Sequence, residues 1–191
     1  RRTMTKQGRV FVICGAAGSG KTTVARYLRT EFHLHRVITH TTRLPRPGER
    51  DGVDYHFETA QSMAKLHLLE AVTYDQARYG SSLEGLAEGW QQGQDDVIVL
   101  DTKGAVTYYQ QLGARVTIIF LTVSKLAALA HRMAERGDAR TAIESRLHSL
   151  EYQRDLHLPA ELQGIAQVVT NDDWATTTKR LRQIVGKTVT D

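Results

Sequence analysis

The sequence predicts an α/β fold in which helices flank a parallel β-sheet. Four short apolar runs rich in β-branched residues are each followed by a segment with helical periodicity, an alternation typical of buried parallel strands and their crossover helices. A glycine-rich turn joins the first run to the first helix. The chain has 191 residues, of which 41% are hydrophobic and 24% charged. This length and composition suit one folded, soluble domain.

Each element of this fold follows from a local signal. The expected buried strands lie at residues 10–14, 97–100, 116–121 and 166–169. The expected helices lie at residues 21–32, about 83–92, 106–112, 125–136, 141–155 and 174–185. Gly137 can adopt the left-handed conformation that ends the fourth helix, and Thr141 with Glu144 forms a capping box that would begin the fifth.

Residues 36–93 have a different texture, with polar turns, tyrosines and arginines. Short strands are expected there at residues 37–39, 55–57 and 70–74. We interpret this stretch as a small insertion in the sheet. Ligands of parallel α/β sheets bind beyond the carboxyl ends of the strands, where such an insertion is well placed to hold a second ligand.

Composition argues against several classes of protein. The longest apolar stretch, residues 116–123, is far shorter than the roughly 20 residues that cross a bilayer, and no secretory signal is visible, so we expect no membrane partner. Cys14 is the single cysteine, which favours the reducing cytoplasm. The net charge of +4 suits an anionic partner. Patterns for stacking nucleic acid bases or for binding zinc are absent, so we expect neither.

The segment GAAGSGKT at residues 15–22 fits the pattern of a phosphate-binding loop between a strand and a helix. Its glycines let backbone N–H groups surround phosphate oxygens, Lys21 can neutralise their charge, and the Thr22 hydroxyl can bind Mg²⁺. A purely structural glycine turn is the alternative. The residues predicted to bind the nucleotide are Gly15, Ala17, Gly18, Ser19, Gly20, Lys21, Thr22 and Thr23.

Two further features indicate anion and metal chemistry. Asp101 follows the strand at residues 97–100, so its carboxylate would lie at the strand tip beside substrate or Mg²⁺-bound water. The alternative is that Asp101 caps the next helix. Arg43 and Arg46 flank Pro45, and a turn stiffened by proline would direct both guanidinium groups toward one anion. A solvated basic loop is the alternative there.

Together these segments resemble guanylate kinase over nearly the whole chain. The most specific part is TTRLPRPGERDGVDYHF at residues 41–57, because the phosphate loop alone indicates only a nucleoside triphosphate. The other matching positions are Glu70, Tyr79, Gly80, Ser81, Asp101, Gly104, residues 132–137 and residues 169–172. The resemblance implies an enzyme that uses ATP and Mg²⁺ to phosphorylate GMP or dGMP in purine nucleotide metabolism.

The resemblance also implies an architecture: a P-loop NTPase-type parallel sheet flanked by helices, with a nucleoside-monophosphate-binding insertion and a helical lid. The core would comprise residues 1–35, 94–124 and 160–191. The GMP-binding part would comprise residues 36–93, and the lid residues 125–159. A monomer or a homodimer would fit this architecture.

By position, the resemblance assigns the acceptor site. The GMP phosphate would be bound by Arg43, Arg46, Tyr55 and Tyr79. Guanine would be recognised by Thr39, Glu70 and Ser81, with Asp101 also contacting the substrate. Glu70 would accept from N1–H and the 2-amino group of guanine, whereas adenine has no donor at N1. The hydroxyl groups of Thr39 and Ser81 would donate to O6.

The same resemblance assigns the donor side. Arg132, Arg136 and Arg146 would be lid arginines, although a solvated helix face is the alternative for such spacing. Asn171 and Asp172 would lie near the adenine of ATP, and Asp172 could instead cap the last helix. The implied catalytic residues are Lys21, Arg43, Asp101, Arg132, Arg136 and Arg146. The attacking phosphate of GMP is already an anion, so no general base is expected.

The sequence departs from the family pattern beside the second buried strand. Val99 and Lys103 stand where the family usually has an acidic residue and a glutamine, and His40 replaces a common serine. The segment between Phe57 and Glu70 is also short, which predicts a short helix there. These changes motivate an alternative function, a guanylate-kinase-like nucleotide-binding or regulatory module with weak or lost transferase activity.

Overall fold

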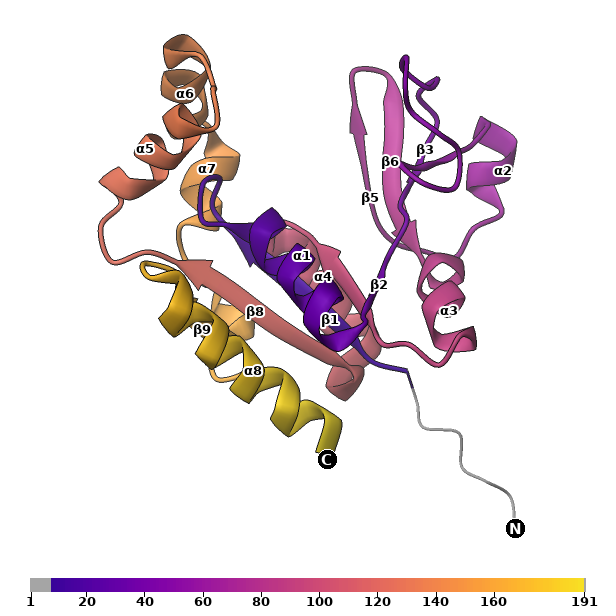
Figure 1. Ribbon diagram of the computed structural model, residues 1–191. Coiled ribbons are helices and arrows are strands. Elements are labelled where there is room, and N and C mark those ends of the chain that lie inside the picture. The colour runs from indigo at the N-terminus through magenta and orange to yellow at the C-terminus, as the bar shows by residue number, and fades with distance from the viewer. Residues whose placement is uncertain (1–7, 191) are drawn as a thin grey trace.

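The computed structural model describes residues 8–190, and its centre is a five-stranded parallel sheet (Figure 1). In chain order the strands are β1 (Val10–Gly15), β2 (His35–Arg36), β7 (Asp96–Val99), β8 (Val116–Thr122) and β9 (Gln167–Thr170). Their spatial order is β2-β7-β1-β8-β9, and every neighbouring pair is parallel. After β1 the chain crosses to β2 at one edge of the sheet, and after β7 it crosses to β8 on the other side of β1. The carboxyl ends of β1 and β7 therefore form the crevice where such sheets bind ligands. The predicted fold class is confirmed.

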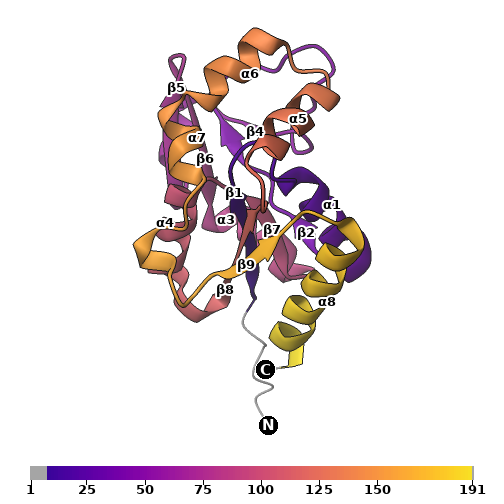
Figure 2. The same cartoon turned by 90° about the vertical axis from the view of Figure 1, so that its left-hand side faces the viewer.

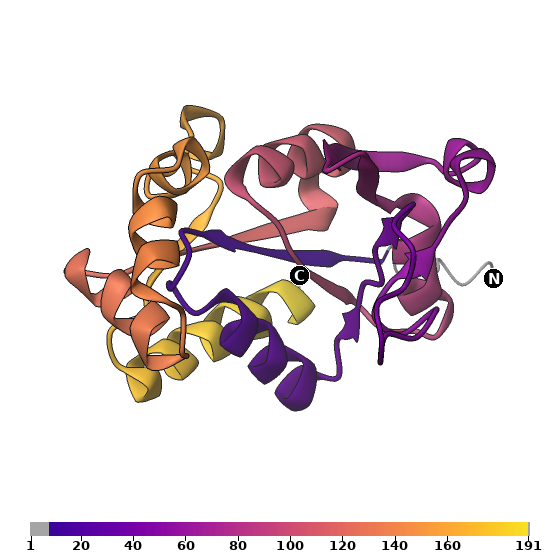
Figure 3. The same cartoon turned by 90° about the horizontal axis from the view of Figure 1, so that it is seen from above.

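Helices cover both faces of the sheet. α1 (Lys21–Phe32) and α8 (Trp174–Thr190) lie on one face and α4 (Thr102–Leu112) on the other, as the view from above shows (Figure 3). Side chains of β1 alternate between the two faces: Phe11 and Ile13 join the apolar cluster of Leu28 in α1, and Val12 joins that of Tyr108 in α4. Because both faces are buried, the strand is apolar throughout rather than alternating.

The insertion forms a second, four-stranded sheet. Its strands are β3 (His40–Thr41), β4 (His56–Phe57), β5 (Leu68–Tyr74) and β6 (Ala77–Ser82), in the order β4-β3-β6-β5. The β5–β6 hairpin turns at Asp75 and Gln76, whose φ values of 49° and 64° are left-handed. Two helices accompany this sheet, α2 (Ala60–Ala64) and α3 (Leu83–Gln91). α2 has only five residues, as the short segment after Phe57 predicts.

Three helices after β8 form an arm, which comprises α5 (Ala127–Glu135), α6 (Arg140–Leu147) and α7 (Leu150–Asp155). Single 3-10 turns lie at Gly113–Arg115 and Ala160–Leu162. The arm and the second sheet stand on opposite sides of the phosphate loop, and Figure 2 shows the arm above β8, β9 and α8. Gly137 has a φ of 95° and ends α5 as predicted. No helix in the described part of the chain is long and apolar enough to span a bilayer.

The strand predictions for the insertion need correction. Residues 37–39 are not a strand, because the chain leaves the edge of the core sheet after Arg36 and crosses to the second sheet, where β3 begins at His40. β5 begins at Leu68, two residues before the predicted start, and β4 is shorter than predicted. β6 has no strand signal in the sequence, since its buried positions include Gly80 and serines rather than large apolar residues.

The single helix predicted at residues 141–155 is wrong, because α6 and α7 are separate helices. Ser149 divides them: its Oγ accepts a hydrogen bond of 3.1 Å from the backbone N–H of Tyr152 and so caps α7. The predicted capping box at Thr141 is also absent, since α6 follows Ala139 without a side-chain cap. The arm therefore contains one more joint than the sequence predicts.

Candidate active site

The turn between β1 and α1 forms a cradle of the kind that holds phosphate. Gly15, Gly18 and Gly20 have φ values of 141°, 83° and 101°, which residues with a Cβ rarely adopt. A Cβ on Gly20 would lie 2.3 Å from Nδ2 of Asn171. The Ser19 hydroxyl is buried without a hydrogen-bond partner in the described residues. Because the first turn of α1 also presents unpaired N–H groups, the loop fits a phosphate group.

Lys21 and two arginines concentrate positive charge beside this cradle. Nζ of Lys21 donates to the Gly15 carbonyl at 2.7 Å, so the side chain folds over the loop. Burial lowers the pKa of Lys21, Asp155 opposes this, and Arg146 and Arg136 lower the pKa further. Lys21, Arg146 and Asp155 line a cavity of about 500 Å³. Between residues 8 and 190, no carboxylate forms an ion pair with Arg146, although the carboxylates of Glu151 and Asp155 line the same cavity as the two cations.

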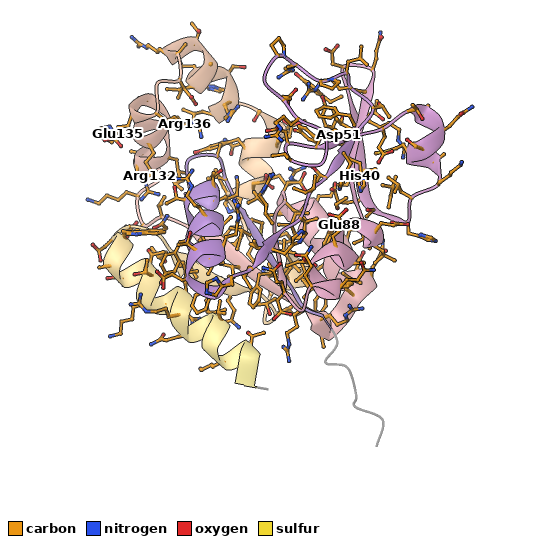
Figure 4. All side chains as sticks on the ribbon, turned by 45° about the vertical axis from the view of Figure 1, so that its right-hand side comes forward. His40, Asp51, Glu88, Arg132, Glu135 and Arg136 are labelled. Atoms are coloured by element: carbon orange, nitrogen blue, oxygen red, sulfur yellow. The ribbon has the colours of Figure 1, made fainter. Side chains whose placement is uncertain are left out.

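Arg132 contacts the phosphate loop itself. Its guanidinium donates to the Gly18 carbonyl at 3.3 Å and also to the carbonyl of Asn171. Arg136 lies four residues later on the same arm (Figure 4). It instead forms an ion pair of 2.7 Å with Asp138. The arginines that the sequence groups together as lid residues therefore have different partners.

Asp101 caps α4, which confirms the structural alternative considered for it. Its Oδ1 accepts from the Gly104 N–H at 2.6 Å, so the helix begins at Thr102 rather than at the predicted residue 106. Its Oδ2 lies 3.3 Å from the guanidinium of Arg154 in α7. Asp155, only 8% exposed, accepts from Oγ1 of Thr102 at 2.6 Å and from its N–H at 3.2 Å. These bonds join the arm to the helix that follows β7.

On the other side of the strand ends, Arg43 lies beside two tyrosines. The Arg43 guanidinium is 5.4 Å from the Tyr55 ring centroid, and the rings of Tyr55 and Tyr79 are 6.2 Å apart. Hydrogen bonds of 2.7 and 3.0 Å join Arg43 to the Glu49 carboxylate and hold the pKa of Glu49 at about 2. Arg46 donates its backbone N–H to Glu49 at 2.7 Å and leaves its side chain exposed. Glu49 is therefore the anion that Arg43 binds in this state.

Glu70 and Ser81 face each other across the β5–β6 pair. Oγ of Ser81 donates to Oε1 of Glu70 at 3.0 Å. Burial raises the pKa of Glu70, and the hydrogen bond from Ser81 opposes that rise. Thr39 forms no hydrogen bond with either of them among the described residues and lines a separate cavity of about 570 Å³ with Thr22 and Val99. The structure thus brings two of the three predicted guanine-binding residues together.

The end of β9 supports the phosphate loop. Asn171 is 7% exposed, and its Nδ2 donates to the Ser19 carbonyl at 2.9 Å. Asp172 accepts from the backbone N–H of Ser124 at 3.0 Å and does not cap α8. Asp173 is the capping residue, because its Oδ2 accepts from a backbone N–H in the first turn of that helix at 2.9 Å. The capping role considered for Asp172 is therefore wrong by one residue.

Comparison with known proteins places this arrangement in one family. The family profile described as guanylate kinase matches residues 7–188. The guanylate kinase of Neisseria meningitidis serogroup A is 35% identical over 186 residues, which cover 94% of this chain and 88% of that protein. The chain belongs to the guanylate kinase family. The guanylate kinase of Desulfotalea psychrophila is 30% identical over 185 residues, covering 94% and 89% of the two chains.

A solved structure agrees at the level of the fold. The crystal structure of guanylate kinase from Anaplasma phagocytophilum superimposes with a TM-score of 0.63 at 20% identity, covering 97% of this chain and 88% of that chain. The P-loop NTPase-type sheet expected of a guanylate kinase is therefore present, and the family membership identifies a kinase.

One departure from the guanylate kinase pattern is part of a hydrogen-bond network. His40 is 3% exposed, and its Nε2 hydrogen-bonds to Oγ of Ser82 at 2.6 Å, while its Nδ1 bonds to Glu58 at 3.0 Å. The side chain thereby links β3 to the start of α3. Val99, the second departure, is 39% exposed at the end of β7 and borders the cavity that Thr22 also lines.

Three residues around the site were not identified from the sequence. Glu49 lies inside the recognised motif, but nothing local indicates that it pairs with Arg43. The sequence predicts Asp155 only as the last residue of a helix, whereas in the structure it accepts a hydrogen bond from Thr102, 53 positions earlier. Tyr108 lies in a predicted helix and packs in the core, and its hydroxyl also donates to Ser81, a predicted substrate-binding residue.

Proposed function

We propose that this protein transfers the γ-phosphoryl group of ATP to GMP or dGMP, within purine nucleotide metabolism. The observation that carries the proposal is a pair of regions with basic side chains on the two sides of the β1 and β7 strand ends. The first contains the phosphate loop with Lys21 and Arg146. The second contains Arg43 with Tyr55 and Tyr79. Two anionic nucleotides bound in these regions would approach each other through their phosphates.

The donor region suits ATP and Mg²⁺. The Thr22 hydroxyl is exposed in the first turn of α1 and has no hydrogen-bond partner within residues 8–190, which leaves it free to bind the metal. No cluster of three or more histidine, cysteine or acidic side chains in the described residues would hold a metal ion alone. This suits Mg²⁺, which proteins commonly bind together with substrate phosphates. The metal would offset negative charge on the phosphates.

The proposed chemistry depends on positioning and charge. The phosphate of GMP is already anionic, so the protein need not remove a proton from it. We propose that this phosphate replaces the Glu49 carboxylate on Arg43, with Arg46 and both tyrosines around it. Lys21, Arg132, Arg136 and Arg146 would then surround the transferring group. Asp101 stays 41% exposed at the strand tip, which supports its proposed contact with substrate.

The remaining assignments are part of the same proposal. Residues 36–93 would form the GMP-binding part, residues 125–159 the lid, and residues 1–35, 94–124 and 160–191 the core. Asn171 and Asp172 would lie at the adenine end of ATP. We place the enzyme in the cytoplasm, a proposal supported by Cys14, whose buried thiol is free in the described structure.

The test is a coupled ADP-release assay with ATP and Mg²⁺ and five acceptors: GMP, dGMP, AMP, UMP and CMP. We expect turnover with GMP and dGMP, and much less with AMP because Glu70 would face the acceptor N1 of adenine. Flat signals for all five, together with calorimetric binding of GMP, would instead indicate the binding or regulatory module. Equal turnover of AMP and GMP would exclude the role given to Glu70.

A substitution of Lys21 tests whether the two regions bind different nucleotides. Lys21→Ala is expected to lower kcat about 10²–10³-fold, because a preorganised cation on the transferring phosphate is lost. Calorimetric affinity for GMP should stay within about twofold, since Lys21 belongs to the donor region. Lys179→Ala, on the exposed side of α8, is the matched control. Parallel loss of GMP affinity in Lys21→Ala would show that the two regions are misassigned.

A further inference from the structure

Tyr108 places a hydroxyl group between the core and the guanine-binding side chains. Its ring lies on α4 in the apolar cluster between that helix and the sheet, and the whole side chain is 0% exposed. Its hydroxyl oxygen lies 2.6 Å from Oγ of Ser81, which is itself 0% exposed on β6. Ser81 in turn bonds to Glu70 on β5 at 3.0 Å. A core helix is thus connected to the specificity residues by two consecutive hydrogen bonds.

The direction of these bonds follows from counting hydrogens. An ionised carboxylate only accepts, so the single hydroxyl hydrogen of Ser81 is donated to Glu70 and not to O6 of guanine, the acceptor expected for it from the resemblance. Oγ of Ser81 therefore accepts from Tyr108, which donates its own hydrogen. Burial raises the pKa of Tyr108, so the phenol keeps that hydrogen at neutral pH. We name this directed chain, from Tyr108 through Ser81 to Glu70, the Tyr108 relay.

The relay favours the form of Glu70 that accepts from guanine. Guanine offers N1–H and a 2-amino group to an ionised carboxylate, whereas adenine offers an acceptor at N1. A protonated Glu70 could donate to that acceptor and would tolerate adenine. Hydrogen bonds donated to a carboxylate favour its ionised form, so the bond from Ser81 works against the adenine-compatible form. The donation from Tyr108 holds the Ser81 hydroxyl in the orientation that makes this bond.

We propose that Tyr108 is a positioning residue for base specificity, which acts through Ser81 to hold Glu70 ready for guanine. The inference rests on the proposed function, because it assigns a residue to the recognition of the same acceptor. It adds a residue of the core helix α4 that does not itself reach the substrate. Gln111 of the same helix donates to the Leu69 carbonyl at 3.2 Å, so α4 and β5 stay joined without the relay.

The neighbouring residue supplies a matched control. Tyr109 also packs partly buried against the same apolar cluster, but its hydroxyl has no hydrogen-bond partner among the described residues. Tyr108→Phe and Tyr109→Phe therefore remove the same atom from adjacent positions of one helix. Only the first removes a relay bond. Both variants keep the aromatic ring that fills the core, and a thermal melt verifies that each is folded.

The experiment measures kcat and KM for GMP and for AMP in wild type and both variants. In Tyr108→Phe we expect KM for GMP to rise about five- to tenfold, the effect of losing roughly one hydrogen bond, with kcat within about twofold. The GMP-to-AMP ratio of kcat/KM should fall by about the same factor. Tyr109→Phe should match wild type. An unchanged KM and ratio in Tyr108→Phe would overturn the proposal, as would the same change in both variants.

A double-mutant cycle with Ser81→Ala tests the route. If Tyr108 acts through Ser81, adding Tyr108→Phe to Ser81→Ala changes the GMP-to-AMP ratio no further, whereas an additive loss overturns the route. Failure of the proposed function is distinguishable, because wild type itself would then not phosphorylate GMP. In that event calorimetric Kd values for GMP and AMP replace the kinetic ratio, with the same expected changes.

Discussion

Asp96 shows how much a single buried carboxyl group can affect the stability of this protein. It is 0% exposed at the start of β7 and lies 2.8 Å from Nδ1 of His35, while its second oxygen is buried without a partner among the described residues. Burial raises the pKa of Asp96 to about 8. The folded protein therefore binds a proton there that the unfolded chain releases near pH 4.

This shift predicts a loss of stability as pH rises. A raised folded-state pKa means that the stabilising contribution of Asp96 is fully present below pH 4 and is lost as pH approaches about 8. His35, whose pKa burial lowers, contributes the opposite slope below about pH 6.5, so the effect of Asp96 is measured between pH 6.5 and 8. We expect the free energy of unfolding to fall over this interval in wild type and to change little in Asp96→Asn.

Urea unfolding at a series of pH values measures how the free energy of unfolding changes with pH in wild type and in Asp96→Asn. Asp75→Asn is the control, because Asp75 is exposed in the β5–β6 turn and should leave the wild-type slope intact. An equally steep decline in Asp96→Asn would contradict the assignment of the slope to this carboxyl group.

At the scale of the elements, α7 attaches the arm to α4. Its last residues carry Arg154, which pairs with Asp101, and Asp155, which accepts two hydrogen bonds from Thr102. Arg154 also donates to Asp155 at 2.9 Å. The helix thus fixes the base of the arm to the first turn of α4. The buried Tyr152 of α7 packs with α5 rather than with α4, so polar bonds carry the attachment to α4.

Removing the Asp155 carboxylate should weaken this attachment. Asp155→Ala leaves the N–H and hydroxyl of Thr102 without their acceptor and Arg154 without one partner. We expect the free energy of unfolding to fall by about 2 kcal/mol, the usual cost of leaving buried hydrogen-bond donors such as those of Thr102 without an acceptor. Urea denaturation measures this loss. Glu151→Ala in the exposed first turn of α7 serves as control, and equal small losses in both variants would disprove the attachment.

At the scale of the whole molecule, the two regions with basic side chains belong to parts that stand apart. Arg146 lies in α6 of the arm, and Arg43 lies between β3 and β4 of the four-stranded sheet. The arm and this sheet stand on opposite sides of the phosphate loop (Figures 1 and 3). Phosphoryl transfer requires the reacting atoms within about 3.5 Å of each other. We therefore expect the arm and the second sheet to approach each other when both nucleotides are bound.

Small-angle X-ray scattering tests this closure. We expect the radius of gyration to fall when GMP and a non-hydrolysable ATP analogue with Mg²⁺ are both present, because basic side chains of the arm and of the second sheet would then bind adjoining phosphates. AMP in place of GMP should leave the radius unchanged. A radius that stays constant with both GMP and the analogue would show that the observed arrangement is already the working one.

Prediction from sequence succeeded where a pattern is local. The phosphate loop needs positive φ values at its glycines and a helix directly after it, and eight consecutive residues encode both conditions. Helix boundaries were less predictable where a side-chain cap decided them, as at Asp101 and Ser149. The strand β6 was not predicted, because small and polar residues occupy its buried positions.

The sequence alone determined the α/β class, the phosphate loop and the family resemblance, because these depend on short-range periodicity and on contiguous motifs. The tertiary structure decided which partner each polar side chain takes. Arg132 binds the loop carbonyl of a residue 114 positions away, Arg43 binds Glu49, and Tyr108 donates to Ser81. The reason is physical: a hydrogen bond depends on distance and direction in space, and only packing of the elements brings donors and acceptors from separate segments within reach.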